Sequence, residues 1–481
     1  MSKTYEIPIL ARGRVIRPSA GDSVEFGGRS GARFRTPDPH KHIHDLVLAD
    51  AGKLQDLYDT PMSAILDFLA ALGPRLNWKQ NPYLQDSFAM AIEAGGLTEP
   101  LMRRLYDSLP QMFDRKMMEA RIDKSVGIHY LDSWVPQGQD GVAAGIRVRA
   151  VGSRQLHITA GNVPIVAPGT VISGALTKSD CLIKTPSNDP LTANAVVRTM
   201  IEMDPNHPVT RHFAVAYWKG GDNIMDSEII RTSRIDKITA WGGMTSMQHI
   251  QKFLVPGLDL VSMNPKFSFS IVGKEAFESE ENLKEAATGI AIAAGKFNQS
   301  ACSSTRIVYV ESDTDDDSIQ RLIRLGEHVY DGFQNLPEYF STPASTPNTS
   351  LDAELDAISM EDDFYWVKGN SITGGVVVSK FDNQVDFAGE LTSRIINIIP
   401  LADINRLLDN VDDQSQTIGV YPASLRVRLR DQLAMRGAQR MFVLSSNLFD
   451  PVESGSVAAL PHDGNETLRR SVRWMIDVGA E

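Results

Sequence analysis

The feature that most constrains the fold is a regular alternation of strand-like and helix-like segments between residues 155 and 254. Short apolar runs rich in β-branched and aromatic residues alternate with longer runs that have helical spacing. The strand-like runs are LHIT (156–159), CLIKT (181–185), FAVAYW (213–218) and KITAW (237–241). This alternation predicts a parallel sheet with helices on both faces, and such sheets bind ligands at the carboxyl ends of their strands. We therefore expect a site among the turns AGNVP, TPSND, KGGD and GGMTS.

The rest of the chain extends this pattern without repeating it. The first 150 residues are predicted to form short strands and then helices, and a second α/β unit is expected to begin at FSFSIV (267–272). A chain of 481 residues exceeds the usual size of a single core, so two or three domains are expected.

Charge and cysteine usage exclude several classes of protein. A formal charge of −12 leaves no basic footprint for nucleic acid. The N-terminus lacks an apolar stretch of signal-peptide length, and the most apolar windows are too short to cross a bilayer, so we expect neither export nor membrane insertion. Only two cysteines are present, which argues against a disulfide framework and favours the reducing cytoplasm.

The two cysteines stand in different chemical contexts. Cys302, in FNQSACSSTR, follows small and polar residues directly before an alternating strand-like run. A reactive thiol needs partial exposure and nearby donors, which this stretch can supply, although a buried loop residue would fit it as well. Cys181 lies inside the apolar run DCLIKTP, where a small hydrophobic residue would serve.

Three other motifs are weaker. PHKHIHDL would place His40, His42 and His44 on one face of a strand, but no second ligand cluster follows it, so we expect a half-exposed strand and no metal. The acidic run ESDTDDDS precedes a predicted helix, whose N-terminus its aspartates would cap. The chain contains no GxGxxG, and AWGGMTSM (240–247) is the nearest glycine turn between a strand and a helix.

Taken in order, AGNVPIVAPGTVISGALTKSDCLIKTPSNDPLTANAVV, AWGGMTSM and FNQSACSSTR resemble the aldehyde dehydrogenase superfamily. Within it, GALTKSDCLIKTPSNDPLTAN, DPNHPVTR, AWGG, QTIGVYP and RDQLAMRGAQR resemble the acyl-CoA reductase family, to which the fatty-acid reductase of bacterial bioluminescence belongs. The resemblance covers residues 150–478 well and says little about the substrate. It implies an α/β fold of the aldehyde dehydrogenase type, with a Rossmann-type cofactor domain and an α/β catalytic domain.

The resemblance also assigns parts to the chain. It implies an NADP(H)-binding domain with the N-terminal elements (1–262), a catalytic domain carrying Cys302 (263–450), and a C-terminal segment (451–481) that packs back on the domain junction or an oligomer interface. Cys302 would be the nucleophile that takes the acyl group as a thioester. The Asn162 amide and the Cys302 backbone N–H would bind the thioester oxygen.

The cofactor residues follow from the same resemblance. Lys184, with Thr185 and Ser187 beside it, would bind ribose hydroxyls or a phosphate of the dinucleotide. Gly242 and Gly243 would line the pyrophosphate turn, and Glu390, in AGELTSR, would hold the nicotinamide ribose.

Two departures from the superfamily refine the expectation. Ser262, in VSMNPK, stands where hydrolytic members keep a Glu general base, so an acyl-enzyme would lose its acyl group to water slowly unless another carboxylate substitutes. Ser187 stands where many NAD enzymes keep a Glu. A hydroxyl can donate a hydrogen bond to a 2′-phosphate oxygen, and Lys184 adds a positive charge nearby, so NADPH is favoured. Ser187 as a simple helix cap is the alternative.

These inferences lead to one expected activity and one alternative enzyme; a non-catalytic subunit that only docks an acyl-transfer partner would need Cys302 and Asn162 to be dispensable. We expect an NADPH-dependent acyl thioester reductase that forms aldehyde from acyl-CoA or from an acylated partner protein. The alternative is an aldehyde dehydrogenase that oxidises aldehyde to acid or acyl-CoA. The resemblance also implies a homo-oligomer, either a dimer or a tetramer.

Overall fold

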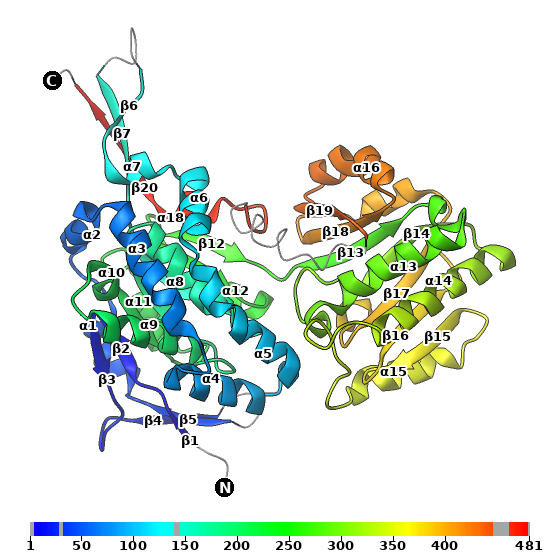
Figure 1. Ribbon diagram of the computed structural model, residues 1–481, viewed down its shortest axis with the longest axis horizontal. Coiled ribbons are helices and arrows are strands. Elements are labelled where there is room, and N and C mark those ends of the chain that lie inside the picture. Colours follow the sequence, from blue (N-terminus) through cyan, green and yellow to red (C-terminus); the bar gives the residue numbers. More distant parts are fainter. Residues whose placement is uncertain (1–3, 28–31, 139–144, 446–460, 480–481) are drawn as a thin grey trace. The chain divides into compact units, whose positions relative to one another are not determined.

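The computed structural model describes residues 4–27, 32–138, 145–445 and 461–479, and the chain divides into two compact units (Figure 1). The first unit comprises Met1–Gly96, Met102–Asn264 and Ser454–Glu481, and the second comprises Leu97–Leu101 and Pro265–Glu453. The predicted boundary at residue 450 falls within 446–460, outside the described residues. The assignment of cofactor and catalytic roles to domains stays a prediction.

The first unit is built on a seven-stranded sheet with the order β12-β11-β8-β9-β10-β2-β3. Its strands are β2 (Ile9–Ala11), β3 (Arg14–Ile16), β8 (Arg154–Ile158), β9 (Asp180–Lys184), β10 (Phe213–Ala216), β11 (Lys237–Trp241) and β12 (Asp259–Met263). The five strands β8 to β12 are parallel, and the sequence predicted the first four of them. The hairpin of β2 and β3 extends the sheet antiparallel to β10, which sequence periodicity did not predict.

Helices alternate with these strands, and the sequence pattern predicted all of them except the short helix at residues 208–211. They are α8 (Val166–Leu176), α9 (Thr192–Met203), α10 (Pro208–Arg211), α11 (Asn223–Ile229) and α12 (Met244–Gln251). Earlier in the chain lie η1 (Pro39–His42), α1 (Ile43–Leu46), η2 (Ala51–Leu54), α2 (Gln55–Asp59), α3 (Met62–Leu72), η3 (Gly73–Leu76), α4 (Pro82–Glu93), α5 (Glu99–Ser108), η4 (Leu109–Phe113), α6 (Arg115–Ser125) and α7 (Ile128–Asp132). The first 150 residues thus form short strands and then helices, as predicted.

Two small sheets complete the first unit. One has the order β1-β5-β4, from β1 (Thr4–Glu6), β4 (Val24–Gly27) and β5 (Arg33–Thr36). The other has the order β20-β7-β6, from β6 (Val135–Pro136), β7 (Ile146–Val151) and β20 (Arg473–Val478), and α18 (Thr467–Ser471) precedes β20. β20 thus brings the last described residues back to β7, as an antiparallel partner.

The second unit is built on another seven-stranded sheet, with the order β15-β16-β17-β14-β13-β18-β19. Its strands are β13 (Phe267–Val272), β14 (Ile307–Glu311), β15 (Tyr365–Asn370), β16 (Gly374–Ser379), β17 (Ile395–Leu401), β18 (Ser415–Tyr421) and β19 (Arg440–Val443). Its helices are η6 (Lys274–Phe277), α13 (Glu280–Gly295), η7 (Lys296–Gln299), α14 (Asp316–Gln334), α15 (Thr349–Ser359), η8 (Ala388–Glu390), η9 (Ile404–Asn410) and α16 (Ala423–Met435). All strands but β15 run parallel.

Alternating side chains on these strands fill two cores. Ile307 and Tyr309 face the core that α15 and α16 cover, whereas Val308 and Val310 face the core of α13 and α14. This two-sided burial explains why the strands read as nearly continuous apolar runs. Because parallel strands end at one edge, the sheet collects the turns after them on that side.

Local signals account for several helix starts and for one wrong prediction. Asp315 caps α14 by accepting from Ser318 N, as predicted for the acidic run. The predicted histidine strand is wrong, because Asp38 accepts from His40 N and Pro39 begins η1, so PHKHIHDL is helical. Within the described residues, no helix has both the length and the hydropathy needed to cross a bilayer.

Candidate functional site

In the first unit, the predicted site residues follow neighbouring parallel strands. Asn162 lies between β8 and α8, Ser187 between β9 and α9, and Gly243 at the cap of α12 after β11. β8 pairs with β9 on one side and with β11 on the other, so chain order reverses at β8. Open α/β sheets bind ligands at such a point, and the three turns lie together there.

The turn that carries Asn162 is fixed by a close approach to the next turn. Asn188 donates from Nδ2 to the carbonyl oxygen of Gly161 at 2.9 Å. A Cβ at Gly161 would lie 2.1 Å from Asn188 Oδ1 and 2.8 Å from Pro186 Cγ, so the position requires glycine. Asn162 itself is solvent-exposed. The packing of Asn188 thus sets the path of the backbone that presents it.

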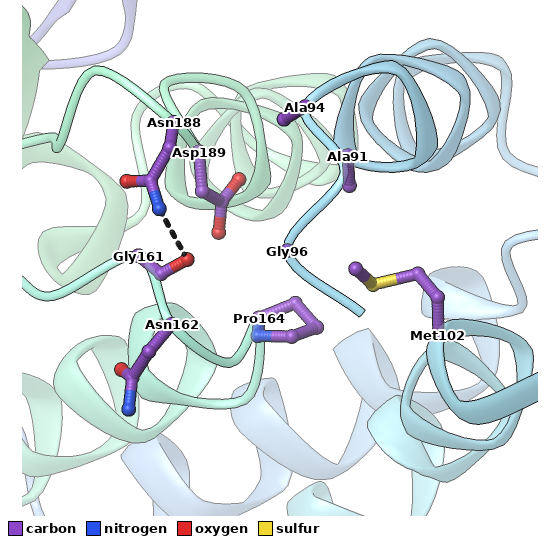
Figure 2. A pocket seen from close by; sticks show the side chains of 9 residues that line it. All are labelled: Ala91, Ala94, Gly96, Met102, Gly161, Asn162, Pro164, Asn188 and Asp189. Carbon is purple, nitrogen blue, oxygen red and sulfur yellow. Dashed lines mark hydrogen bonds between the residues drawn. The ribbon is translucent and has the colours of Figure 1, made fainter. Parts of the chain in front are cut away.

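Figure 2 shows a small pocket beside this turn, where the two turns meet residues from the N-terminal helices. Its polar lining comes from Gly161, Asn162, Asn188 and Asp189, and its apolar lining from Ala91, Ala94, Gly96, Met102 and Pro164. The carboxyl group of Asp189 points into the space between the turns, whereas the amide of Asn162 points away from it. The Asn162 amide therefore lies on the side of its turn that faces away from the pocket.

Asp189 is a buried carboxyl group, one of whose oxygens accepts two hydrogen bonds. Its Oδ1 accepts from Thr192 N at 3.1 Å and from Thr192 Oγ1 at 2.6 Å. Thr192 Oγ1 lies 3.1 Å from the hydroxyl of Tyr106, which also bonds Ser87. Burial raises the pKa of Asp189 from 3.8 to about 6, and the two bonds from Thr192 oppose this shift only in part.

Lys184 ends β9 as a buried cation. Its Nζ lies 5.2 Å from the centroid of the Trp218 ring, and the structure shows no hydrogen bond from this ammonium group to another described residue. Burial lowers the pKa of Lys184, while Asp226 and Asp222 oppose the shift through their charges. A buried ammonium group lacking an acceptor fits a ribose hydroxyl or a phosphate oxygen at this edge.

The other predicted cofactor residues differ in their exposure to solvent and in the groups they could offer to a ligand. Thr185 is buried, and its hydroxyl donates to the carbonyl oxygen of Ala216 at 3.5 Å. Ser187 is half-buried in the turn. Gly243 is exposed and caps α12 without a side-chain hydrogen bond, and a Cβ there would meet no atom within 4 Å. Backbone N–H groups at this helix start are thus accessible to an anion.

In the second unit, Cys302 lies in the loop between η7 and β14, as a half-buried free thiol. Three consecutive residues before it, Phe297, Asn298 and Gln299, have φ of 51°, 52° and 65°. Non-glycine residues with such positive φ values have a strained backbone. Surrounding contacts must keep them in this conformation. Gln299 supplies those contacts through its side chain, which bonds Thr305 O, Ile395 O and Ile395 N.

The sulfur of Cys302 faces donors and cations. Gln416 donates from Nε2 to Sγ at 3.2 Å, and Ser268 Oγ donates to the carbonyl oxygen of Cys302 at 2.7 Å. Desolvation lowers the pKa of both Lys296 and Arg306, and the charge of Cys302 opposes the shift in each. The Lys296 side chain is exposed, so solvent screens its charge.

Cys181 has the opposite environment. It is completely buried on β9, and burial raises the pKa of its thiol well above the ordinary value. A Cβ at Gly174 would lie 2.3 Å from its sulfur, so the helix above packs tightly on it. The interpretation of Cys181 as a buried small hydrophobic residue is confirmed.

Glu390 and Ser262 occupy different units. Glu390 ends η8 in the second unit and is exposed, and Ser262 lies half-buried on the edge strand β12 of the first. Cys302 and Asn162 also belong to different units. The joint oxyanion site and the role of Glu390 therefore stay predictions. The described residues contain no group of three or more His, Cys, Asp or Glu side chains able to hold a metal ion.

Three residues of the thiol's surroundings were missed by the sequence interpretation. Gln416 is 114 positions from Cys302, and although it begins the block QTIGVYP, nothing in that block signals a thiol partner. Lys296 and Arg306 flank the cysteine closely enough in sequence that their charges were available as a signal. Basic residues close in sequence to a candidate nucleophile are a reason to expect a stabilised thiolate.

Comparison with known proteins agrees with this arrangement. Residues 57–474 match the family model of the acyl-CoA reductases (LuxC). The long-chain acyl-protein thioester reductase of Vibrio harveyi is 26% identical over 446 residues, which cover 91% of this chain and 86% of that protein. The protein of the same name from Photorhabdus laumondii is 29% identical and covers 98% of this chain, with 93% of its own length matched.

Solved structures establish the fold. The NADP-dependent glyceraldehyde-3-phosphate dehydrogenase of Bacillus halodurans, complexed with NADP, has a TM-score of 0.71 at 14% identity, with 98% of this chain and 99% of that one covered. Aldehyde dehydrogenase C of Pseudomonas syringae, a C291A mutant complexed with NAD⁺ and octanal, has a TM-score of 0.70 at 12% identity and coverages of 98% and 96%. The predicted fold and family are thus confirmed: the chain belongs to the acyl-CoA reductase (LuxC) family and has the aldehyde dehydrogenase fold.

Proposed function

We propose that this chain reduces a long-chain fatty acyl thioester to the aldehyde, with NADPH as reductant and an acyl-Cys302 thioester as intermediate. The observation that carries the proposal is the environment of Cys302, a half-buried free thiol that accepts from an amide and lies near two cations. Such an environment favours the thiolate, which is the form that attacks an acyl carbonyl.

The same environment supports transfer of the acyl group to hydride rather than to water. Among the described residues, the groups that interact with Cys302 through its sulfur or its charge are an amide and two cations, none of them a carboxylate. A general base must reach the attacking water, and Ser262 has no basic group to offer. The acyl-enzyme is therefore expected to persist until it is reduced.

The first unit fits a nicotinamide dinucleotide. The buried Lys184 ammonium group, the open Gly243 turn and the accessible start of α12 would hold its ribose and phosphate groups. Ser187, a hydroxyl where a Glu would repel a 2′-phosphate, supports NADPH over NADH. A reduced nicotinamide bound there would supply hydride. Asn162 would donate its amide to the carbonyl oxygen as negative charge develops on it.

The acyl donor is either acyl-CoA or an acylated partner protein, and we infer a cytoplasmic enzyme. A homo-oligomer, dimer or tetramer, is supported by β20, where Met475, Ile476 and Val478 are 54%, 59% and 72% exposed. Exposed apolar side chains on an edge strand favour pairing with another chain. Size-exclusion chromatography with light scattering tests the oligomer.

The activity is tested by following a radiolabelled long-chain acyl-CoA in two incubations. Without reduced cofactor, the label should accumulate on the protein, map to Cys302 by peptide mass spectrometry and appear only slowly as free fatty acid. NADPH should then release it as aldehyde. Cys302→Ala should abolish both steps, and Cys181→Ala serves as the matched thiol control. Rapid release of acid without cofactor would favour the alternative, an aldehyde dehydrogenase with a base elsewhere.

A further inference from the structure

The contact between Gln416 and Cys302 is the starting observation. Gln416 is the second residue of β18 and is 2% exposed, so its side chain is confined by the second unit's own packing. Its amide nitrogen lies 3.2 Å from Cys302 Sγ, within the range of a hydrogen bond to sulfur. The amide is buried while the thiol is half-buried, so the donor cannot turn away to solvent and stays beside the sulfur.

The orientation of the amide is set by a chain of donors behind it. Arg440 donates to Thr417 Oγ1 from Nε at 3.2 Å and from a terminal nitrogen at 2.8 Å. A guanidinium group has only donors, so the proton of the Thr417 hydroxyl is left for the oxygen of Gln416, 3.4 Å away. With its oxygen engaged there, the amide presents its N–H group to the sulfur.

The backbone of Cys302 is held by the same part of the sheet. Ser268, on the neighbouring strand β13, donates from its hydroxyl to the carbonyl oxygen of Cys302 at 2.7 Å. The same hydroxyl accepts from Thr417 N at 3.2 Å. Two adjacent residues of β18 therefore fix both the sulfur and the main chain of the cysteine, so the hydrogen bond is preorganised.

Arg306 is a cation that interacts with Cys302 through its charge. The guanidinium group of Arg306 donates to three carbonyl oxygens, those of Leu391, Ser304 and Gln299, at 3.0, 3.3 and 3.4 Å. Arg306 is thus held by backbone oxygens on both sides of the cysteine in its own loop and by that of Leu391. A donor amide and a fixed cation both favour a sulfur that carries negative charge.

We propose that Gln416 is a catalytic residue that donates a hydrogen bond to the Cys302 thiolate whenever the sulfur carries the charge. This inference rests on the proposed function and adds a group that neither the motifs nor the family match assigns. In acyl transfer, an electron pair of the Cys302 sulfur forms the bond to the acyl carbon. The bond between that carbon and the donor's sulfur breaks, and its pair leaves with the donor thiolate.

The same hydrogen bond acts again when the aldehyde leaves. After reduction of the acyl carbon, the oxyanion re-forms a carbonyl group as the bond to Cys302 breaks, and the electron pair returns to the sulfur. Gln416 then donates to the thiolate that is being expelled. An amide suits both stages, because it stabilises the anion without taking up a proton and cannot activate water as a base.

The test measures how the thiol ionises, independently of any reductase turnover. In a Cys181→Ala background, where Cys302 is the only thiol, the rate of alkylation by iodoacetamide is recorded from pH 5 to pH 10. Gln416→Met keeps the length of the side chain but removes the donor, and should move the pH midpoint of alkylation upward by about one unit, or about tenfold less thiolate at pH 7. Gln416→Glu, which places a carboxylate against the sulfur, should move it further.

A control and a second variant keep the inference falsifiable. Gln334→Met removes an exposed amide on α14 that donates to Tyr330 O and Thr373 O, and should leave the midpoint unchanged. If Gln416→Met does not fold, Thr417→Val leaves Gln416 in place but removes the hydroxyl that orients it, and should give an intermediate shift. An unchanged midpoint in every folded variant of Gln416 or Thr417 would overturn the inference.

A parallel measurement separates this inference from the proposed function. Acyl-enzyme formation from acyl-CoA, without cofactor, should be about tenfold slower at pH 7 in Gln416→Met and should recover at high pH. If wild-type Cys302 is never acylated but the alkylation midpoint still shifts, the proposed function fails and the hydrogen bond stands. If acylation proceeds normally and the midpoint does not move, the function stands and the role of Gln416 is refuted.

Discussion

Asp189 gives the sharpest quantitative prediction, because its buried carboxyl group binds a proton more tightly in the folded protein than in the unfolded chain. Its pKa is raised from 3.8 to about 6, chiefly by burial. A raised carboxyl pKa means that the folded state is favoured at low pH, and this contribution is lost as pH rises from about 4 to above 6. Linkage over that window gives a loss of about 2.5 kcal/mol between pH 4 and pH 7.

Asp189→Asn should remove this pH dependence while keeping the oxygen that accepts from Thr192 N and Oγ1. The amide also brings a buried NH₂ group, which costs about 1–3 kcal/mol if it lacks an acceptor. That cost does not vary with pH, so it cancels when the mutant is compared with wild type at two pH values. The difference in unfolding free energy, mutant minus wild type, should therefore rise by about 2.5 kcal/mol from pH 4 to pH 7.

Tryptophan fluorescence during urea unfolding measures this difference in the relevant unit. Five tryptophans lie in the first unit and one in the second: Trp78, Trp134, Trp218, Trp241 and Trp474, against Trp366. A Trp366→Phe background thus makes the signal report the first unit alone. A mutant-minus-wild-type difference that stays constant within about 0.5 kcal/mol across the pH range would refute the assignment of a raised pKa to Asp189.

Three further predictions concern the site in the first unit. Asn162→Ala should lower kcat about 10²–10³-fold with little change in the KM for NADPH, and a loss confined to cofactor binding would show that the residue is misplaced. Gly161→Ala should displace the same turn, because its Cβ would lie 2.1 Å from Asn188 Oδ1, and we expect reduced turnover with a near-wild-type far-ultraviolet circular dichroism spectrum; full activity would contradict this. Ser187→Glu should raise the KM for NADPH at least about tenfold more than the KM for NADH, and kcat/KM values showing that the wild-type enzyme prefers NADH would contradict the charge argument.

The sequence by itself determined most of the parallel strands and helices of the first unit's seven-stranded sheet. It also identified the family. Strands β8 to β11 and helices α8, α9, α11 and α12 fall where alternation of short apolar runs and helix-like runs predicted them, because side-chain periodicity reports the local conformation directly. The motifs around Asn162, Lys184 and Cys302 indicated the family, because their order along the chain is preserved. The histidine segment failed for an equally local reason: the alternating histidines suggested a strand, but Asp38 and Pro39 begin a helix there.

Only the tertiary structure decided what surrounds the reactive thiol. The parallel pairing of β13 with β18, in which Phe269 lies opposite Ile418, brings Gln416 beside a loop more than a hundred residues earlier in the chain. No local pattern encodes that pairing, since a buried strand reads as the same apolar run whatever strand it pairs with. Likewise, the raised pKa of Asp189 and the lowered pKa of Lys184 depend on burial by elements distant in sequence. Such properties follow from how the sheet is assembled, because desolvation and hydrogen bonding depend on which atoms the fold places nearby.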